Sequence, residues 1–83
     1  MTWTKTEIED ARQSDLAEVL AQRGYDVRPL RGGAVLVAEL KDLVVNRSYW
    51  FWRSQKLKGN PIDFFMLVEG KTFAETMAIL CPD

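Results

Sequence analysis

The stretch LVVNRSYWFW, residues 43–52, decides the fold. Residues 43–45 and 49–52 are runs of aliphatic and aromatic side chains of the kind that favour strands. The polar triplet Asn46-Arg47-Ser48 lies between the two runs and provides the residues for a turn. The stretch therefore predicts two antiparallel strands joined by a tight connection.

A second strand pair is indicated upstream of this hairpin. Residues 25–30 alternate in character, and Gly32-Gly33 then leads into the apolar run of residues 34–38. Alternation followed by a glycine turn and an apolar run is typical of two strands with a short connection. Together the two pairs predict a meander of three or four antiparallel strands.

The aromatic run also indicates how its side chains divide between the two faces of this sheet. Alternation along a strand sends Tyr49 and Phe51 to one face and Trp50 and Trp52 to the other. Residues 34–38 and 43–45 are apolar at every position, which is typical of strands that are covered on both faces. We expect either helices on both sides of the sheet or a leftover apolar patch that meets a partner.

The first third of the chain predicts an amphipathic helix. Thr4 with Glu7, and Thr6 with Glu9, both match a capping box ahead of apolar residues at helical spacing. Ser14-Asp15 offers a second N-cap that would divide this helix into two pieces. Gly24 stands where a left-handed residue would end it.

Two more helices are expected after the sheet. Asn60-Pro61 combines an N-cap residue with a proline at the first helical position, and the helix should run to Gly70. Thr72 and Glu75 form a capping box for a further helix, and residues 53–59 are expected to be a polar, basic loop. The predicted fold class is α+β, with one N-terminal and two C-terminal helices in a single domain, residues 1–83.

Composition excludes several functions. The 83 residues contain no histidine and a single cysteine, Cys81, so Ser-His-Asp or Cys-His catalysis, an intrinsic zinc site and an internal disulfide are all excluded. Neither GxxxxGK[ST] nor GxGxxG occurs, and no apolar stretch is long enough to cross a bilayer. We expect a non-catalytic cytoplasmic domain with no cofactor, no metal and no membrane association.

Charge is distributed unevenly along the chain. Residues 23–58 hold eight basic and three acidic residues, a net charge of +5, whereas residues 1–22 and 59–83 carry −3 each. A basic sheet with aromatic side chains has the two requirements of single-strand binding, phosphate neutralisation and base stacking. The residues predicted to neutralise phosphates or to stack a base are Arg47, Trp50, Trp52, Arg53, Lys56 and Lys58. The alternative is an ordinary solvated face above a core that contains the aromatic rings.

Four segments of the chain occur in a characteristic order, namely DLAEVL (15–20) with Gly24-Tyr25, WFW (50–52), GNPIDFF (59–65) and EGKTFAET (69–76). Together they resemble the zinc-ribbon domain at the N-terminus of bacterial-type DNA primases. The resemblance is stronger to zinc-less relatives that precede TOPRIM domains in proteins of plasmids and other mobile elements. It covers nearly the whole chain, and its sharpest part is a helix start followed by a Glu-Gly-x-x-Phe-x-Glu turn. The resemblance implies a degenerate zinc-ribbon-like fold and contact with single-stranded template DNA.

The metal ligands of that family are absent from this sequence. Positions 38–41 hold no Cys/His pair, and Trp52 and Gln55 stand where a second pair of cysteines would align. Trp52 is therefore expected to join the two hairpin tips by packing. The acidic residues of a TOPRIM domain have no counterpart, so the resemblance implies a non-catalytic module of, or accessory to, a TOPRIM primase or mobilisation protein.

A different class of function stays open. The chain can also be a protein-interaction module that docks on a TOPRIM, relaxase or helicase partner through an uncovered apolar face. An exposed aromatic side chain ringed by Arg and Lys would favour nucleic acid as the partner. An exposed aliphatic patch with acidic neighbours would favour protein.

Overall fold

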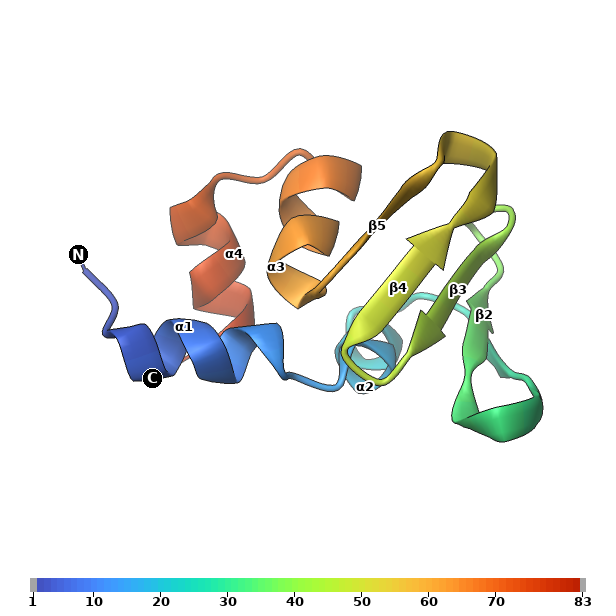
Figure 1. Ribbon diagram of the computed structural model, residues 1–83, viewed down its shortest axis with the longest axis horizontal. Helices are drawn as coiled ribbons and strands as arrows, with labels where there is room; N and C mark the ends of the chain where they lie inside the picture. Colours follow the sequence, from blue (N-terminus) through green and yellow to red (C-terminus); the bar gives the residue numbers. More distant parts are fainter. Residues whose placement is uncertain (1, 83) are drawn as a thin grey trace.

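The computed structural model describes residues 2–82 and consists of a sheet layer and a helix layer (Figure 1). The sheet is a five-stranded antiparallel meander with strand order β1-β2-β3-β4-β5. The α+β prediction is confirmed, and the sheet has one strand more than the three or four expected. Its strands are β1 (Val27–Pro29), β2 (Val35–Val37), β3 (Leu43–Asn46), β4 (Tyr49–Trp52) and β5 (Leu57–Gly59).

The additional strand, β5, corrects the expectation that residues 53–59 form a loop. Its three residues pair with β4, so that Lys58 lies opposite Phe51 and Leu57 opposite Trp52. Leu57 is half-buried and Lys58 exposed, which is the alternation of a strand with one covered face. The strand is too short, and too rich in polar residues, for its period to be visible in the sequence.

Two helices occupy the N-terminal third, as the alternative N-cap at Asp15 predicted. Helix α1 (Lys5–Arg12) begins at Thr4, whose hydroxyl accepts a hydrogen bond from the amide of Glu7 at 3.1 Å. Helix α2 (Leu16–Gln22) begins at Asp15, whose carboxylate accepts from the amide of Glu18 at 3.3 Å. Thr4, rather than Thr6, is therefore the N-cap residue of the first helix.

The C-terminal helices also start where the sequence predicted. Helix α3 (Pro61–Asp63) is capped by Asn60 and continues as the π-helical segment η3 (Phe64–Val68). Helix α4 (Phe73–Leu80) is capped by the box that Thr72 and Glu75 form. None of the helices within residues 2–82 is long and apolar enough to span a membrane.

The core lies between the helices and the inward face of the sheet. Trp50 is fully buried, and its indole N–H donates a hydrogen bond to the carbonyl of Asn60 at 2.8 Å. Its ring meets that of Phe64 edge to face at a centroid distance of 5.6 Å. The other fully buried members of this cluster are Leu16, Leu20, Val37, Leu43, Val45 and Phe65. Strands β3 and β4 therefore turn alternate side chains into the core.

The outward face of the sheet is left open by the helices of the described chain, which lie on the opposite side (Figure 1). Phe51 and Tyr49 point to this open face and are 40% and 49% exposed. Of the two arrangements the sequence allowed, coverage on both sides is therefore wrong, and a leftover apolar patch is present. The apolar residues at every position of β2 and at residues 43–45 of β3 reflect this patch rather than a second layer of helices.

Candidate nucleic-acid interface

One row of outward side chains crosses all five strands. The register places Arg28 opposite Leu36, Leu36 opposite Val44, Val44 opposite Phe51, and Phe51 opposite Lys58. Cross-strand neighbours on one face lie within contact distance of each other. The row therefore has a hydrophobic centre with one cation at each end, and we call its five residues the outer row.

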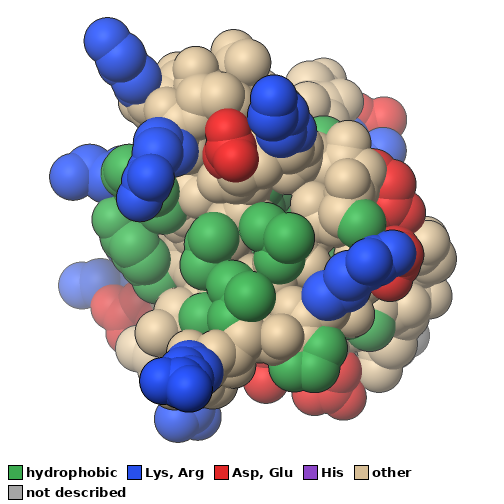
Figure 2. Space-filling view, turned by 90° about the vertical axis from the view of Figure 1, so that its right-hand side faces the viewer, with side chains coloured by type: hydrophobic (Ala, Val, Ile, Leu, Met, Phe, Trp, Pro, Cys, Tyr) green, Lys and Arg blue, Asp and Glu red, His purple; other side chains and the backbone are tan. Residues whose placement is uncertain are grey.

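Strand β4 and the residue that follows it add a second ring and a cation to this face. Tyr49, two residues before Phe51 in β4, shares the outward face with it, and Arg53, directly after β4, lines a hollow on the same face. Figure 2 shows the side of the molecule that lies on the right in Figure 1, where hydrophobic side chains gather and Lys and Arg side chains stand around them. The open face thus presents exposed aromatic rings within a largely basic surround.

A shallow hollow of about 210 Å³ lies on this face. Its walls are the aliphatic side chains of Leu36 and Val44 and the ring of Phe51, with Asp42 and Arg53 at its polar end. Asp42 and Arg53 stand next to the last rung of the β3–β4 ladder, the pair Leu43 and Trp52. The hollow therefore combines a flat apolar floor with one carboxylate and one guanidinium.

The two tryptophans predicted to stack a base do not lie on this face. Trp50 is fully buried, so the expectation that it stacks a base is wrong. Trp52 is half-buried on the inward side, and its indole N–H donates to the carbonyl of Lys41 at 2.7 Å. This hydrogen bond joins the β2–β3 turn to the end of β4, whereas the expectation for Trp52 was packing between the hairpin tips. Phe51 and Tyr49 are the exposed rings instead.

The four predicted basic residues divide into two groups. Lys58 lies on the open face within the outer row, and Arg53 lies beside the hollow. Lys56, in the β4–β5 connection, and Arg47, in the β3–β4 turn, have left-handed backbone conformations with φ of 56° and 58°. Arg53 and Lys58 therefore belong to the open face, and Lys56 lies between them in the chain. Arg47 precedes β4, at the opposite end of this strand from Arg53, and is set apart from the other three.

Sequence reasoning missed Arg28 as a member of this face. Its guanidinium donates to the carboxylate of Asp26 at 3.0 Å, and this hydrogen bond raises the pKa of Arg28. Both side chains of the pair are largely exposed. The alternating pattern of residues 25–30 could have predicted this position, because Arg28 follows Val27, which packs against the core, and so points to the opposite face.

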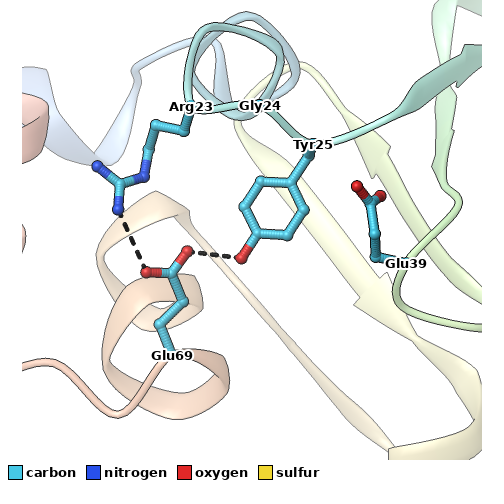
Figure 3. A pocket seen from close by; sticks show the side chains of 5 residues that line it. All are labelled: Arg23, Gly24, Tyr25, Glu39 and Glu69. Carbon is cyan, nitrogen blue, oxygen red and sulfur yellow. Dashed lines mark hydrogen bonds and ion pairs between the residues drawn. The ribbon is translucent and has the colours of Figure 1, made fainter.

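A second hollow lies on the other side of the sheet, around Tyr25 (Figure 3). The Tyr25 hydroxyl donates to Glu69 at 2.7 Å, and the same carboxylate forms ion pairs with Arg23 at 3.6 Å and Lys71 at 3.7 Å. Glu39 accepts two hydrogen bonds from the backbone amide of Asp26. These partners account for both carboxylates, so this hollow is a structural network that ties the end of α2 to the end of η3.

The Tyr25 network predicts a loss of stability at high pH. Burial, together with the hydrogen bond to Glu69, raises the pKa of Tyr25 to about 12. The unfolded chain loses this proton near its ordinary pKa of about 10, so the free energy of unfolding should fall as the pH rises from about 10 to about 12. Urea unfolding across this range should show a smaller decline in Tyr25→Phe than in the parent. Tyr49→Phe, which removes an exposed phenol, is the control, and equal declines in both variants would contradict the assignment.

No group of three or more His, Cys, Asp or Glu side chains within residues 2–82 is arranged to hold a metal ion. Comparison of the chain with protein-family models, curated proteins and solved structures finds no match. The open face of the sheet, with the exposed rings of Tyr49 and Phe51 and the hollow beside them, is the candidate functional surface.

Proposed function

We propose that this chain is a non-catalytic, metal-free domain that binds single-stranded DNA on the open face of its sheet. The observation that carries the proposal is the outer row, in which Phe51 is exposed between cations. An exposed aromatic ring offers a stacking surface to any base, and flanking cations neutralise the phosphates on either side. The row spans four strand spacings, on the order of 20 Å, which is enough for a short run of nucleotides.

The cellular setting proposed here is replication or transfer of DNA in the cytoplasm. The resemblance to zinc-less primase ribbons supports a role as a module of, or an accessory to, a TOPRIM primase or mobilisation protein. The hydrogen bond from Trp52 to Lys41 supports a ribbon whose tips are joined without a metal. The single cysteine is in keeping with a reducing compartment.

A second candidate is docking of a TOPRIM, relaxase or helicase partner on the same face. Leu36 and Val44 favour it, because aliphatic side chains offer less to a nucleobase than to a protein partner. The basic surround and the two exposed aromatic rings favour DNA. Asp42, the acidic residue that lines the hollow, favours a protein partner.

Phe51→Ala tests the proposed function. Stacking of a base on an aromatic ring contributes about 1–3 kcal/mol, so the variant should bind single-stranded DNA about 5-fold to 150-fold more weakly. The measurement is fluorescence anisotropy of a labelled mixed-sequence oligonucleotide at about 50 mM and about 200 mM salt. Phe73→Ala is the matched control, since it removes an exposed phenylalanine from α4 on the helix layer.

The salt dependence tests the cations separately. Each phosphate contact on a single strand contributes about 0.7 to the slope of log affinity against log salt, so Lys58→Ala should lower this slope by about 0.7. Arg12→Ala removes the same charge from the end of α1 and should leave the slope unchanged. Absence of binding by the parent at low salt would overturn the DNA proposal and favour the protein-docking candidate.

A further inference from the structure

The hollow on the open face has two charged side chains that are without a hydrogen-bond or ion-pair partner among residues 2–82. No hydrogen bond or ion pair within residues 2–82 engages the carboxylate of Asp42 or the guanidinium of Arg53. Their neighbours in the hollow are Leu36, Val44 and Phe51, which present only carbon atoms. Both charged groups are therefore available to a ligand that lies flat on the ring of Phe51.

The two turns that carry Asp42 and Arg53 are held together by hydrogen bonds. The carbonyl of Lys41, next to Asp42, accepts hydrogen bonds from the Trp52 indole at 2.7 Å and from the Ser54 hydroxyl at 3.4 Å. Trp52 and Ser54 flank Arg53 on both sides in the chain. The two turns are thus bonded to each other, and Asp42 and Arg53, one from each turn, both line the hollow.

This pair of groups discriminates among the four bases. Guanine presents two adjacent donors, N1–H and the N2 amino group, and two acceptors, O6 and N7, next to them. A carboxylate can accept from both donors while a guanidinium donates to both acceptors. Adenine and cytosine each place a ring acceptor beside their amino group, and thymine flanks its single N–H with two carbonyls, so each would set an acceptor against Asp42.

We infer that the hollow selects a guanine base, with Asp42 accepting from its N1–H and N2 amino groups, Arg53 donating to O6 and N7, and Phe51 stacking on its ring. This inference rests on the proposed binding of single-stranded DNA and makes that binding sequence-dependent at one nucleotide. Each bidentate pair of this kind discriminates strongly against a base that cannot form it. The remaining bases meet the outer row only through stacking and phosphate contacts.

The experiment compares thymine-rich oligonucleotides of equal length that differ at one central position. The parent protein should bind the oligonucleotide with a central dG about tenfold more tightly than those with dA, dC or dT. Deoxyinosine at the same position keeps N1–H and O6 but lacks the N2 amino group, and it should lose a large part of this preference. Fluorescence anisotropy at fixed low salt measures all five.

Asp42→Asn is the decisive variant. Asp42 has a left-handed backbone with φ of 68°, a conformation that asparagine tolerates, so the variant is expected to fold as the parent does. It should bind the dT oligonucleotide at least as well as the parent, because a negative charge is removed from the face, yet it should lose the dG preference. Asp10→Asn, on α1, is the charge-matched control and should keep the preference.

The outcomes separate this inference from the function on which it rests. Tight, salt-sensitive binding of all oligonucleotides with equal affinity would overturn the guanine assignment and leave DNA binding in place. Absence of binding to any of them would overturn both. A dG preference that persists in Asp42→Asn would overturn the role of Asp42.

Discussion

The Trp50→Ala variant is expected to lose about 3–5 kcal/mol of its free energy of unfolding, whereas Phe51→Ala should lose much less. Replacing a buried tryptophan by alanine costs about 3–5 kcal/mol, which is comparable with the total stability of a chain of this size, about 4–12 kcal/mol. The two residues are neighbours in β4, and Trp50 is fully buried while Phe51 is 40% exposed. Urea unfolding followed by near-ultraviolet circular dichroism measures both variants.

The large cost at Trp50 has two sources besides the cavity. The carbonyl of Asn60 would lose the indole donor that it accepts from at 2.8 Å. Phe64 would lose its edge-to-face neighbour. A Trp50→Phe variant restores part of the ring volume but not the hydrogen bond, so its stability should fall between those of the parent and Trp50→Ala. A Trp50→Ala protein that is as stable as the parent and fails only in DNA binding would contradict this prediction and place Trp50 in the DNA interface.

The helix starts could be predicted from the sequence because each depends on a few adjacent residues. Thr4 and Thr72 cap their helices through boxes that are visible as a Thr-x-x-Glu pattern. Asn60 followed by Pro61 marks α3 in the same local way. Such signals do not depend on how the chain folds back on itself, so they survive in any tertiary context.

The sheet could be predicted only in part, because its faces are defined by distant segments. Alternation separated Tyr49 and Phe51 from Trp50 and Trp52, and this division is confirmed. The sequence of β4 alone does not determine which of the two pairs faces the helices. This orientation depends on packing against Phe64 in η3 and against residues of α2. The larger rings went into the core, where they bury the most apolar surface.

The candidate site depends on the same choice. The charge distribution along the chain was enough to predict Arg53 and Lys58 as binding residues. The hollow could not be predicted in this way, because it depends on the strand register that sets Leu36 beside Val44 and Val44 beside Phe51. The apolar runs at residues 34–38 and 43–45 predicted either helices on both sides of the sheet or a leftover apolar patch, and in the structure Leu36 and Val44 line an open face. A continuous apolar run is therefore equally compatible with a second helix layer and with a binding surface, and only the tertiary arrangement separates them.

The Gly59→Ala variant is expected to lose about 3 kcal/mol of stability through a contact that the sequence does not reveal. A methyl group at Gly59, where φ is 157°, would lie 2.7 Å from Cβ and 2.9 Å from Cγ of Asp63 and would meet its Oδ2 as well. The Asp63 side chain cannot simply move away, because it accepts from the amide of Asn60 at 3.1 Å within the cap of α3. The expected cost combines loss of this cap, about 1–2 kcal/mol, with backbone strain of about 1–3 kcal/mol.

Two comparisons separate the steric contribution from the backbone contribution. Gly70→Ala places a methyl group at φ of 69° in open space, so its cost should be limited to about 1–2 kcal/mol of left-handed strain. In an Asp63→Gly background the Gly59→Ala change should cost less than in the parent, because the clashing side chain is gone. Urea unfolding of the four proteins in this cycle gives the coupling energy directly. A coupling near zero would show that the Gly59 backbone, and not the Asp63 side chain, requires glycine before α3.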